Sequence, residues 1–150
     1  MYEKILVPID GSDTSSRGLQ EAIGLAKLAG GSIRLIHIVD EMVFTSGIDG
    51  SAVIMGDVIS SLKEAGQSCL DKAREKVEQA GIKADSVLVE GFGTRVSDTV
   101  IEQAARWGAS IIVLGTHGRR GVSRLVLGSD AEQILRSAPV PVLLVRGHSA

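Results

Sequence analysis

Two short glycine-containing segments towards the C-terminus have the composition of an anion-binding loop. The first is Gly115-Thr116-His117-Gly118, and the second, Gly128-Ser129, follows after nine further residues. Glycine lets backbone N–H groups approach an anion closely, and the Ser129 hydroxyl is a further donor. These features favour phosphate binding over the alternative, in which the glycines shape a turn and the serine caps a helix. Three arginines that could neutralise phosphate or simply face solvent lie between the segments: Arg119, Arg120 and Arg124.

A second polar segment, Asp10-Gly11-Ser12-Asp13, directly follows the first apolar run. Asp10 has three interpretations at this point: a metal ligand, a partner for a base or ribose, or an anion at the start of a helix. His117 is interpreted as a loop residue, because no carboxylate or nucleophile at a fixed distance supports a general base. His37 lies inside an apolar run and is expected to be a hydrogen-bonded histidine of the sheet.

Several well-known motifs are missing, and their absence restricts the chemistry. The sequence has no GxxxxGK[ST], which excludes a P-loop NTPase, and the first apolar run is not followed by GxGxxG, which disfavours a dinucleotide redox cofactor. It also has neither a GxSxG nucleophile elbow nor an HExxH metal helix. The sequence therefore points to a binding site more than to a catalytic one.

Apolar runs of strand length alternate with helical patterns along the whole chain. Residues 42–60 fit neither pattern, so the start of the second helix is left open. The alternation predicts one doubly wound α/β domain, 1–150, with a parallel sheet and helices on both faces. Ligands of such domains bind beyond the carboxyl ends of the strands. The strands are expected at 5–9, 33–39, 86–89, 110–114 and 140–145, and helical spacing covers 19–26, 62–80, 96–107 and residues from 129 onward.

Three local patterns place particular elements. Residues 110–114 are apolar throughout, which is typical of a central strand covered on both faces. Pro139 and Pro141 cannot donate to a ladder, which predicts an edge position for the strand at 140–145. The run Ser129-Asp130-Ala131-Glu132 has the spacing of a capping box.

Composition narrows the class of protein. A chain of 150 residues is the size of one ordinary domain, and a net charge of −2 with only four aromatic residues argues against nucleic-acid binding. The single cysteine, Cys69, can form neither an internal disulfide nor a structural zinc site, and is expected to be a small buried side chain. No apolar stretch approaches the roughly 20 residues of a membrane span. We therefore expect a cytoplasmic protein with no membrane partner.

The spacing of the glycine segments, Gly-2x-Gly-9x-Gly-Ser, resembles the motif of the ATP-binding branch of the universal stress protein family. The runs 4–12, 35–40 and 139–145 extend this resemblance over the chain. It implies a Rossmann-like, five-stranded sheet in the order 3-2-1-4-5, with ATP across the carboxyl ends of the first and fourth strands. It also allows magnesium to accompany the triphosphate.

The resemblance implies a role for ten residues. Pro8, Ile9, Asp10 and the backbone of Ile38 would surround adenine and ribose; Leu114 and Gly115 would lie near the ribose; Gly118, Gly128, Ser129 and the amide of Asp130 would hold the phosphates.

The function that follows is that of a nucleotide-dependent regulatory protein of the stress response. One alternative is a slow ATP hydrolase or a self-phosphorylating protein with Ser123, Ser129 or Thr116 as acceptor, and another is a nucleotide-free interaction module. Independently, the apolar edge strand has only Arg146 as a nearby charge, which predicts a homodimer through residues 140–146.

Overall fold

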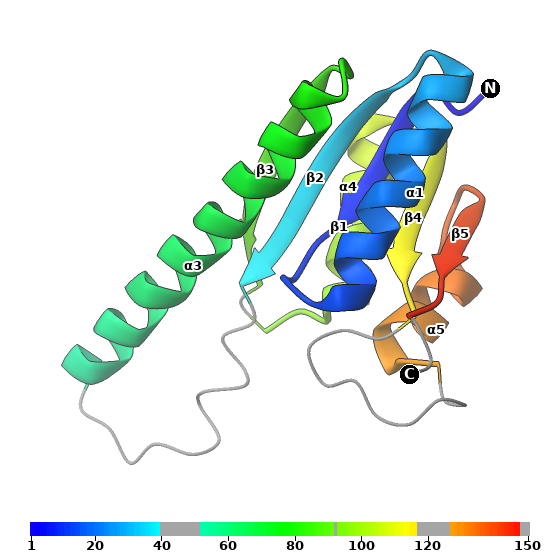
Figure 1. Cartoon of the computed structure of the whole chain (residues 1–150). Helices are drawn as coiled ribbons and strands as arrows, with labels where there is room; N and C mark the ends of the chain where they lie inside the picture. The colour runs from blue at the N-terminus through cyan, green and yellow to red at the C-terminus, as the bar shows by residue number, and fades with distance from the viewer. Residues whose placement is uncertain (40–51, 92, 117–126, 148–150) are drawn as a thin grey trace.

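The computed structural model describes residues 1–39, 52–91, 93–116 and 127–147, and its centre is a five-stranded parallel sheet (Figure 1). The strand order is β3-β2-β1-β4-β5, and every neighbouring pair is parallel. The predicted fold class and strand order are therefore confirmed. The strands are β1 (Lys4–Pro8), β2 (Ser32–Val39), β3 (Ala84–Glu90), β4 (Ile111–Gly115) and β5 (Val142–Val145).

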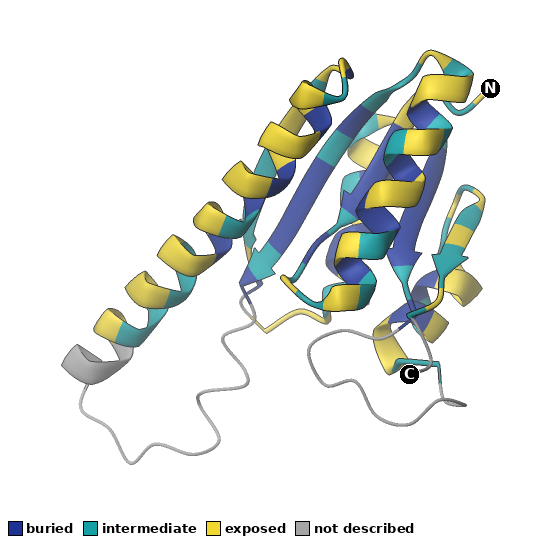
Figure 2. Ribbon diagram, viewed as in Figure 1, coloured by how far each residue is buried: buried dark blue, intermediate teal, exposed yellow. Residues whose placement is uncertain are grey.

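Helices cover both faces of the sheet. One face packs against α1 (Asp13–Ala29) and α3 (Ala52–Gln79), and the other against α4 (Val96–Trp107) and α5 (Ser129–Ser137). Successive residues of a strand point to opposite faces, so Ile5 and Val7 of β1 join the first core while Leu6 joins the second. The inner strands are buried along most of their length, and the outward sides of the helices are exposed (Figure 2).

Local capping signals mark both ends of α1. Ser12 is the N-cap, and its side-chain oxygen accepts the Ser15 N–H at 3.2 Å. Gly30 ends the helix in the left-handed region, at φ 66°. The turn at Ser12 leads directly from β1 into α1, so it fixes the position of the polar segment after β1.

Helix α3 begins at Ala52, earlier than the helical pattern that starts at residue 62. Its first turns project past the carboxyl edge of the sheet (Figure 1), and among its residues of described burial Gly66 is the first that is buried. A helix that projects beyond the sheet has no core to impose an apolar stripe, which is why periodicity did not reveal this part. Cys69 lies further along α3 and packs against the α1/α3 core as expected, but it is half-buried and not fully buried.

Strand β5 is an edge strand, as predicted, but it begins at Val142 and not at residue 140. The Ile112 N–H donates to the Pro141 carbonyl at 3.0 Å, so the backbone of Pro141 faces β4. Because proline has no N–H, Pro141 cannot donate a hydrogen bond to β4, and regular pairing between β4 and β5 starts one residue later.

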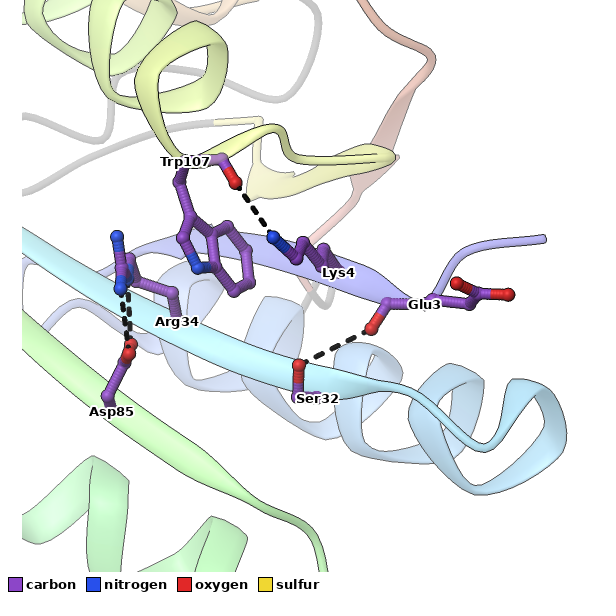
Figure 3. Close-up of polar contacts among 6 residues, drawn as sticks. All are labelled: Glu3, Lys4, Ser32, Arg34, Asp85 and Trp107. Carbon is purple, nitrogen blue, oxygen red and sulfur yellow. Dashed lines mark hydrogen bonds and ion pairs between the residues drawn. The ribbon is translucent and has the colours of Figure 1, made fainter.

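Polar contacts close the amino edge of the sheet (Figure 3). Arg34 of β2 forms two 2.8 Å hydrogen bonds with the carboxylate of Asp85 in β3 and stacks 4.7 Å from the ring centre of Trp107. Lys4 donates from Nζ to the Trp107 carbonyl at 3.1 Å. The Arg34 hydrogen bonds lower the pKa of Asp85 and raise that of Arg34. This cluster joins three strands to the end of α4.

Candidate functional site

Strands β1 and β4 stop pairing before the carboxyl edge because of Pro8. The Lys4 carbonyl accepts the Ser110 N–H, so Lys4 faces β4, and by alternation Leu6 and Pro8 face it too. Pro8 has no N–H to donate, and the β1–β4 register ends at the Leu6↔Ile112 pair. Since β1 is also where the winding direction reverses, this is the switch-point position at which such sheets bind ligands.

Asp10 lies in the turn that connects β1 to α1. Its Oδ1 accepts the Ser12 N–H at 2.9 Å, and its own N–H donates to Ser15 Oγ at 3.2 Å. Gly11 has φ 82°, a left-handed conformation that glycine adopts without strain. The structure thus supports the interpretation of Asp10 as an anion at the start of a helix, and it also places the half-buried carboxylate at the carboxyl edge of β1.

The backbone of Ile38 is directed to the same edge. Ile36 faces β1, since its carbonyl accepts the Ile9 N–H at 2.8 Å, and Val39 faces β3, since its carbonyl accepts the Gly91 N–H at 3.0 Å. Alternation therefore turns both the N–H and the C=O of Ile38 towards the β1 side, beyond the last β1–β2 register pair, Pro8↔Ile36.

The two halves of the glycine motif meet at the end of β4. The Gly128 N–H donates to the Thr116 carbonyl at 2.9 Å, and the Thr116 N–H donates to the Val145 carbonyl at 3.0 Å. These bonds hold the start of α5 beside the carboxyl end of β4. We call the Gly128–Thr116 pair the neck, because it brings together two segments that are far apart in the motif.

Gly115 has a packing role that the sequence did not reveal. A Cβ at this position would lie 2.8 Å from the backbone carbon of Thr14 in the first turn of α1, closer than such atoms approach. At Gly18 of α1, an added Cβ would lie 3.5 Å from the Gly115 backbone nitrogen, an ordinary van der Waals contact. The absence of a side chain at 115 therefore lets α1 pack against the end of β4.

The capping-box prediction for α5 is wrong. The N-cap is Gly128, without a side-chain cap bond, and Ser129 is the first helical residue. Glu132, which a capping box would turn back to the N-cap, instead pairs with Arg136 at 2.7 Å. Ser129 and Asp130 are both exposed at the first turn of α5. Their amides therefore lie at the positive end of the helix dipole.

The remaining predicted residues fall into two groups. Ile9 and Leu114 are 5% and 6% exposed and belong to the two cores, so any ligand contact there would come from backbone. Gly118, His117 and the three arginines lie outside the described residues. Within the described ranges, no group of three or more His, Cys, Asp or Glu side chains could hold a metal ion. In the same ranges, no helix is both long and apolar enough to span a membrane.

His37 is hydrogen-bonded, as predicted: its Nδ1 lies 2.8 Å from the Ile9 carbonyl oxygen. The sequence did not reveal its other neighbour, Gly66 of α3, where a Cβ would come within 2.8 Å of Nε2. No periodicity links these two residues, because the contact depends on how closely α3 approaches β2.

The fold and this edge define the class of protein, a doubly wound α/β domain with its candidate ligand site at the β1/β4 switch point. Residues 1–146 match the Universal stress protein family. The chain belongs to the universal stress protein family.

Three similar proteins illustrate the match. Universal stress protein MJ0531 from Methanocaldococcus jannaschii is 35% identical over 147 residues, which cover 97% of this chain and 83% of that protein. The solved structure of MJ0577 from the same organism matches with a TM-score of 0.86 at 25% identity, over 100% of this chain and 99% of that one. A universal stress protein from Archaeoglobus fulgidus, solved in complex with dAMP, shares the fold with a TM-score of 0.65 at 21% identity, over 96% and 98% of the two chains.

Proposed function

We propose that this protein binds an adenine nucleotide, ATP in the first instance, at the carboxyl edge of β1 and β4. The observation that carries the proposal is the neck, the 2.9 Å bond from the Gly128 N–H to the Thr116 carbonyl. It sets the exposed first turn of α5 beside the end of β4, at the carboxyl edge of the sheet. Helix N-terminal amides with a serine hydroxyl are a suitable cradle for phosphate.

The nucleoside end of the ligand is assigned to the β1/β2 side of this edge. Asp10 supplies a carboxylate for the ribose or base, and Ile38 supplies a backbone N–H and C=O that face the same side. Pro8, Ile9, Leu114 and Gly115 complete the wall through their backbone. The dAMP complex of the Archaeoglobus fulgidus protein supports the choice of adenine, since it shows that this fold can hold that class of ligand.

The phosphates are assigned to Gly118, Gly128, Ser129 and the amide of Asp130. The Asp130 side chain is negative, so only its backbone suits an anion. A magnesium ion would enter with the triphosphate, because phosphate oxygens and waters are its usual ligands.

The function assigned to this binding is regulatory: occupancy by the nucleotide changes what the protein contacts during stress. Of the three hydroxyls suggested as acceptors in a self-phosphorylating protein, Thr116 is only 8% exposed, which argues against transfer to that residue. Rapid hydrolysis is not expected, because neither the sequence nor the described residues of this edge identify a general base.

Two measurements test the proposal. Mass spectrometry of small molecules released from the purified protein should identify an adenine nucleotide, and calorimetric titration should show that ATP binds more tightly than GTP. Gly118→Val should abolish ATP binding by filling the space that backbone donors need. Gly56→Val is the matched control, since a Cβ at that exposed position of α3 meets nothing within 4 Å. A folded Gly118→Val variant that keeps the wild-type affinity would remove this site.

We also propose that two copies associate through the outer edge of β5. Pro141 and Val145 face β4, because their carbonyls accept the N–H groups of Ile112 and Thr116. By alternation, Val142 and Leu144 direct their backbone groups outward, where a second β5 can pair. Leu143, 38% exposed, adds apolar surface to this edge. Antiparallel pairing of identical edges closes with two-fold symmetry.

Light scattering tests the dimer with a matched pair of variants. Leu144→Pro removes an outward N–H and should shift the protein to monomer, whereas Leu144→Ala removes the same side chain and keeps the N–H. The dimer should persist in Leu144→Ala. A monomeric wild type at tens of micromolar protein, or a Leu144→Pro dimer as tight as that of Leu144→Ala, would rule out this interface.

A further inference from the structure

His37 is a buried histidine in β2 that the proposed nucleotide site does not use directly. Its side chain points to the α3 face and is 8% exposed. Nδ1 lies 2.8 Å from the Ile9 carbonyl oxygen. Because a carbonyl can only accept, Nδ1 must carry the proton in this contact. The imidazole therefore donates to the last β2-facing carbonyl at the end of β1.

That carbonyl is the one that a continuing ladder would use. The Ile9 N–H donates to the Ile36 carbonyl at 2.8 Å, which is the last bond of regular β1–β2 pairing. In a regular parallel ladder, the Ile9 carbonyl would next accept the N–H of Ile38. Among the described residues, however, the bond found at the Ile9 carbonyl comes from His37.

Helix α3 holds the imidazole in this position. A Cβ at Gly66 would lie 2.5 Å from His37 Cδ2 and 2.8 Å from Nε2, so the ring rests directly on the helix backbone. Any side chain at position 66 would have to displace the ring, because the helix backbone cannot yield as a flexible side chain does. The ring is thus held between the end of β1 on one side and α3 on the other.

We propose that His37 is a positioning residue for the nucleobase: by donating to the Ile9 carbonyl, it keeps the Ile38 N–H out of the β1–β2 ladder and available to the base. Gly66 makes this possible, because it has no side chain that would displace the imidazole ring. The inference rests on the proposed adenine-nucleotide site and deepens it, because it explains what leaves the backbone of Ile38 open at this edge.

Two variants of His37 separate this role from simple packing. His37→Leu removes the donor, whereas His37→Asn can place its amide nitrogen close to where Nδ1 lies. ATP affinity, measured by calorimetry, should fall about tenfold in His37→Leu, the effect typical of one lost hydrogen bond, and should be largely restored in His37→Asn. A purely structural role would make both variants alike, because neither keeps the ring.

A second pair of variants acts from α3 and leaves His37 unchanged. Gly66→Ala should displace the ring and weaken ATP binding, while Gly56→Ala places a methyl group in open space on the same helix. Both substitutions favour the helix intrinsically, so a difference in ATP affinity between them reports the contact with His37. This pair also keeps the inference testable if His37→Leu does not fold.

Amide hydrogen exchange of Ile38 in the ligand-free protein tests the inference independently of ATP. The Ile38 N–H should exchange rapidly in the wild type, and more slowly in His37→Leu, where it can close onto the Ile9 carbonyl. If the wild type binds no adenine nucleotide, the proposed function fails, and this exchange result still decides the local geometry. If the wild type binds ATP and either His37→Leu binds it equally tightly or the Ile38 amide is already protected, the positioning role is overturned.

Discussion

The two edges of the sheet are built in opposite ways. At the amino edge, side chains from β1, β2 and β3 satisfy one another and the end of α4, with the bidentate Arg34–Asp85 pair stacked on Trp107. At the carboxyl edge, Pro8 ends the β1–β4 ladder and His37 ends the β1–β2 ladder. Backbone groups beyond these points, such as those of Ile38, therefore lie outside the ladders. The difference is consistent with an amino edge that stabilises the sheet and a carboxyl edge that holds the proposed binding site.

The largest expected effect comes from a substitution at the amino edge. Trp107→Ala removes a half-buried indole that packs against the α4/α5 core and carries two cations over its ring. Unfolding by urea should show a loss of about 2 kcal/mol, below the range for a fully buried tryptophan. Trp107→Phe should lose less. ATP affinity should be unchanged in both, and a matching fall in affinity would show that the two edges are coupled.

Next in size is a change at the carboxyl edge. Asp10→Ala should lower ATP affinity by about 1.4 kcal/mol, roughly tenfold, since it removes a directional acceptor from the nucleoside side. Asp10→Asn keeps an oxygen for the Ser12 N–H and should preserve the turn. Calorimetry on both variants, with ATP and with GTP, gives the comparison. An unchanged ATP preference in Asp10→Ala would be evidence against the nucleoside assignment.

A smaller effect, dependent on pH, is expected at Asp85. The hydrogen bonds from Arg34 lower its pKa below the ordinary value of 3.8, so the pair stabilises the folded state above that pH and stops doing so as the pH falls through the lowered pKa. Asp85→Asn should cost about 0.5 kcal/mol at neutral pH, because the carboxylate is half-exposed. The difference in free energy of unfolding between wild type and variant, measured by chemical denaturation, should disappear below about pH 4. A difference that increases in acid would contradict the stabilising role of the Arg34–Asp85 pair.

The smallest expected effect sharpens the description of the carboxyl edge. Ser129 is not an N-cap, so Ser129→Ala should change the free energy of unfolding by less than about 0.5 kcal/mol. Ser12 is a true N-cap, and Ser12→Ala should cost about 1 kcal/mol. Ser129→Ala should nevertheless weaken ATP binding. Equal losses of stability in the two variants would restore the capping interpretation of Ser129.

Much of the fold could be predicted from the sequence because it depends on local signals. Apolar runs located the strands, and Pro139 and Pro141 indicated the edge strand. The early start of α3 could not be predicted, because its first turns project past the carboxyl edge of the sheet, where no strand imposes an apolar stripe. The edge position of β5 was right, but Pro141 acts through the inner ladder and not at the outer edge.

The candidate site was predictable only in part. The motif located Gly128 and Ser129 at the start of a helix, but it could not distinguish an N-cap from a first helical residue, since the two differ by a single position. The packing role of Gly115 and the contact between His37 and Gly66 depend on how closely helices approach strands. Such distances are set by the whole core and leave no pattern in the sequence.

The neck has a consequence for how the chain can vary. One bond between Gly128 and Thr116 fixes both ends of the intervening segment. For a segment held at both ends, doubling its length adds only about 0.6 kcal/mol of closure entropy. The closure entropy of the chain between these anchors should therefore change little with the length of that chain. On closure entropy alone, insertion of a peptide that doubles the chain between residues 116 and 128 should cost the folded protein only about 0.6 kcal/mol.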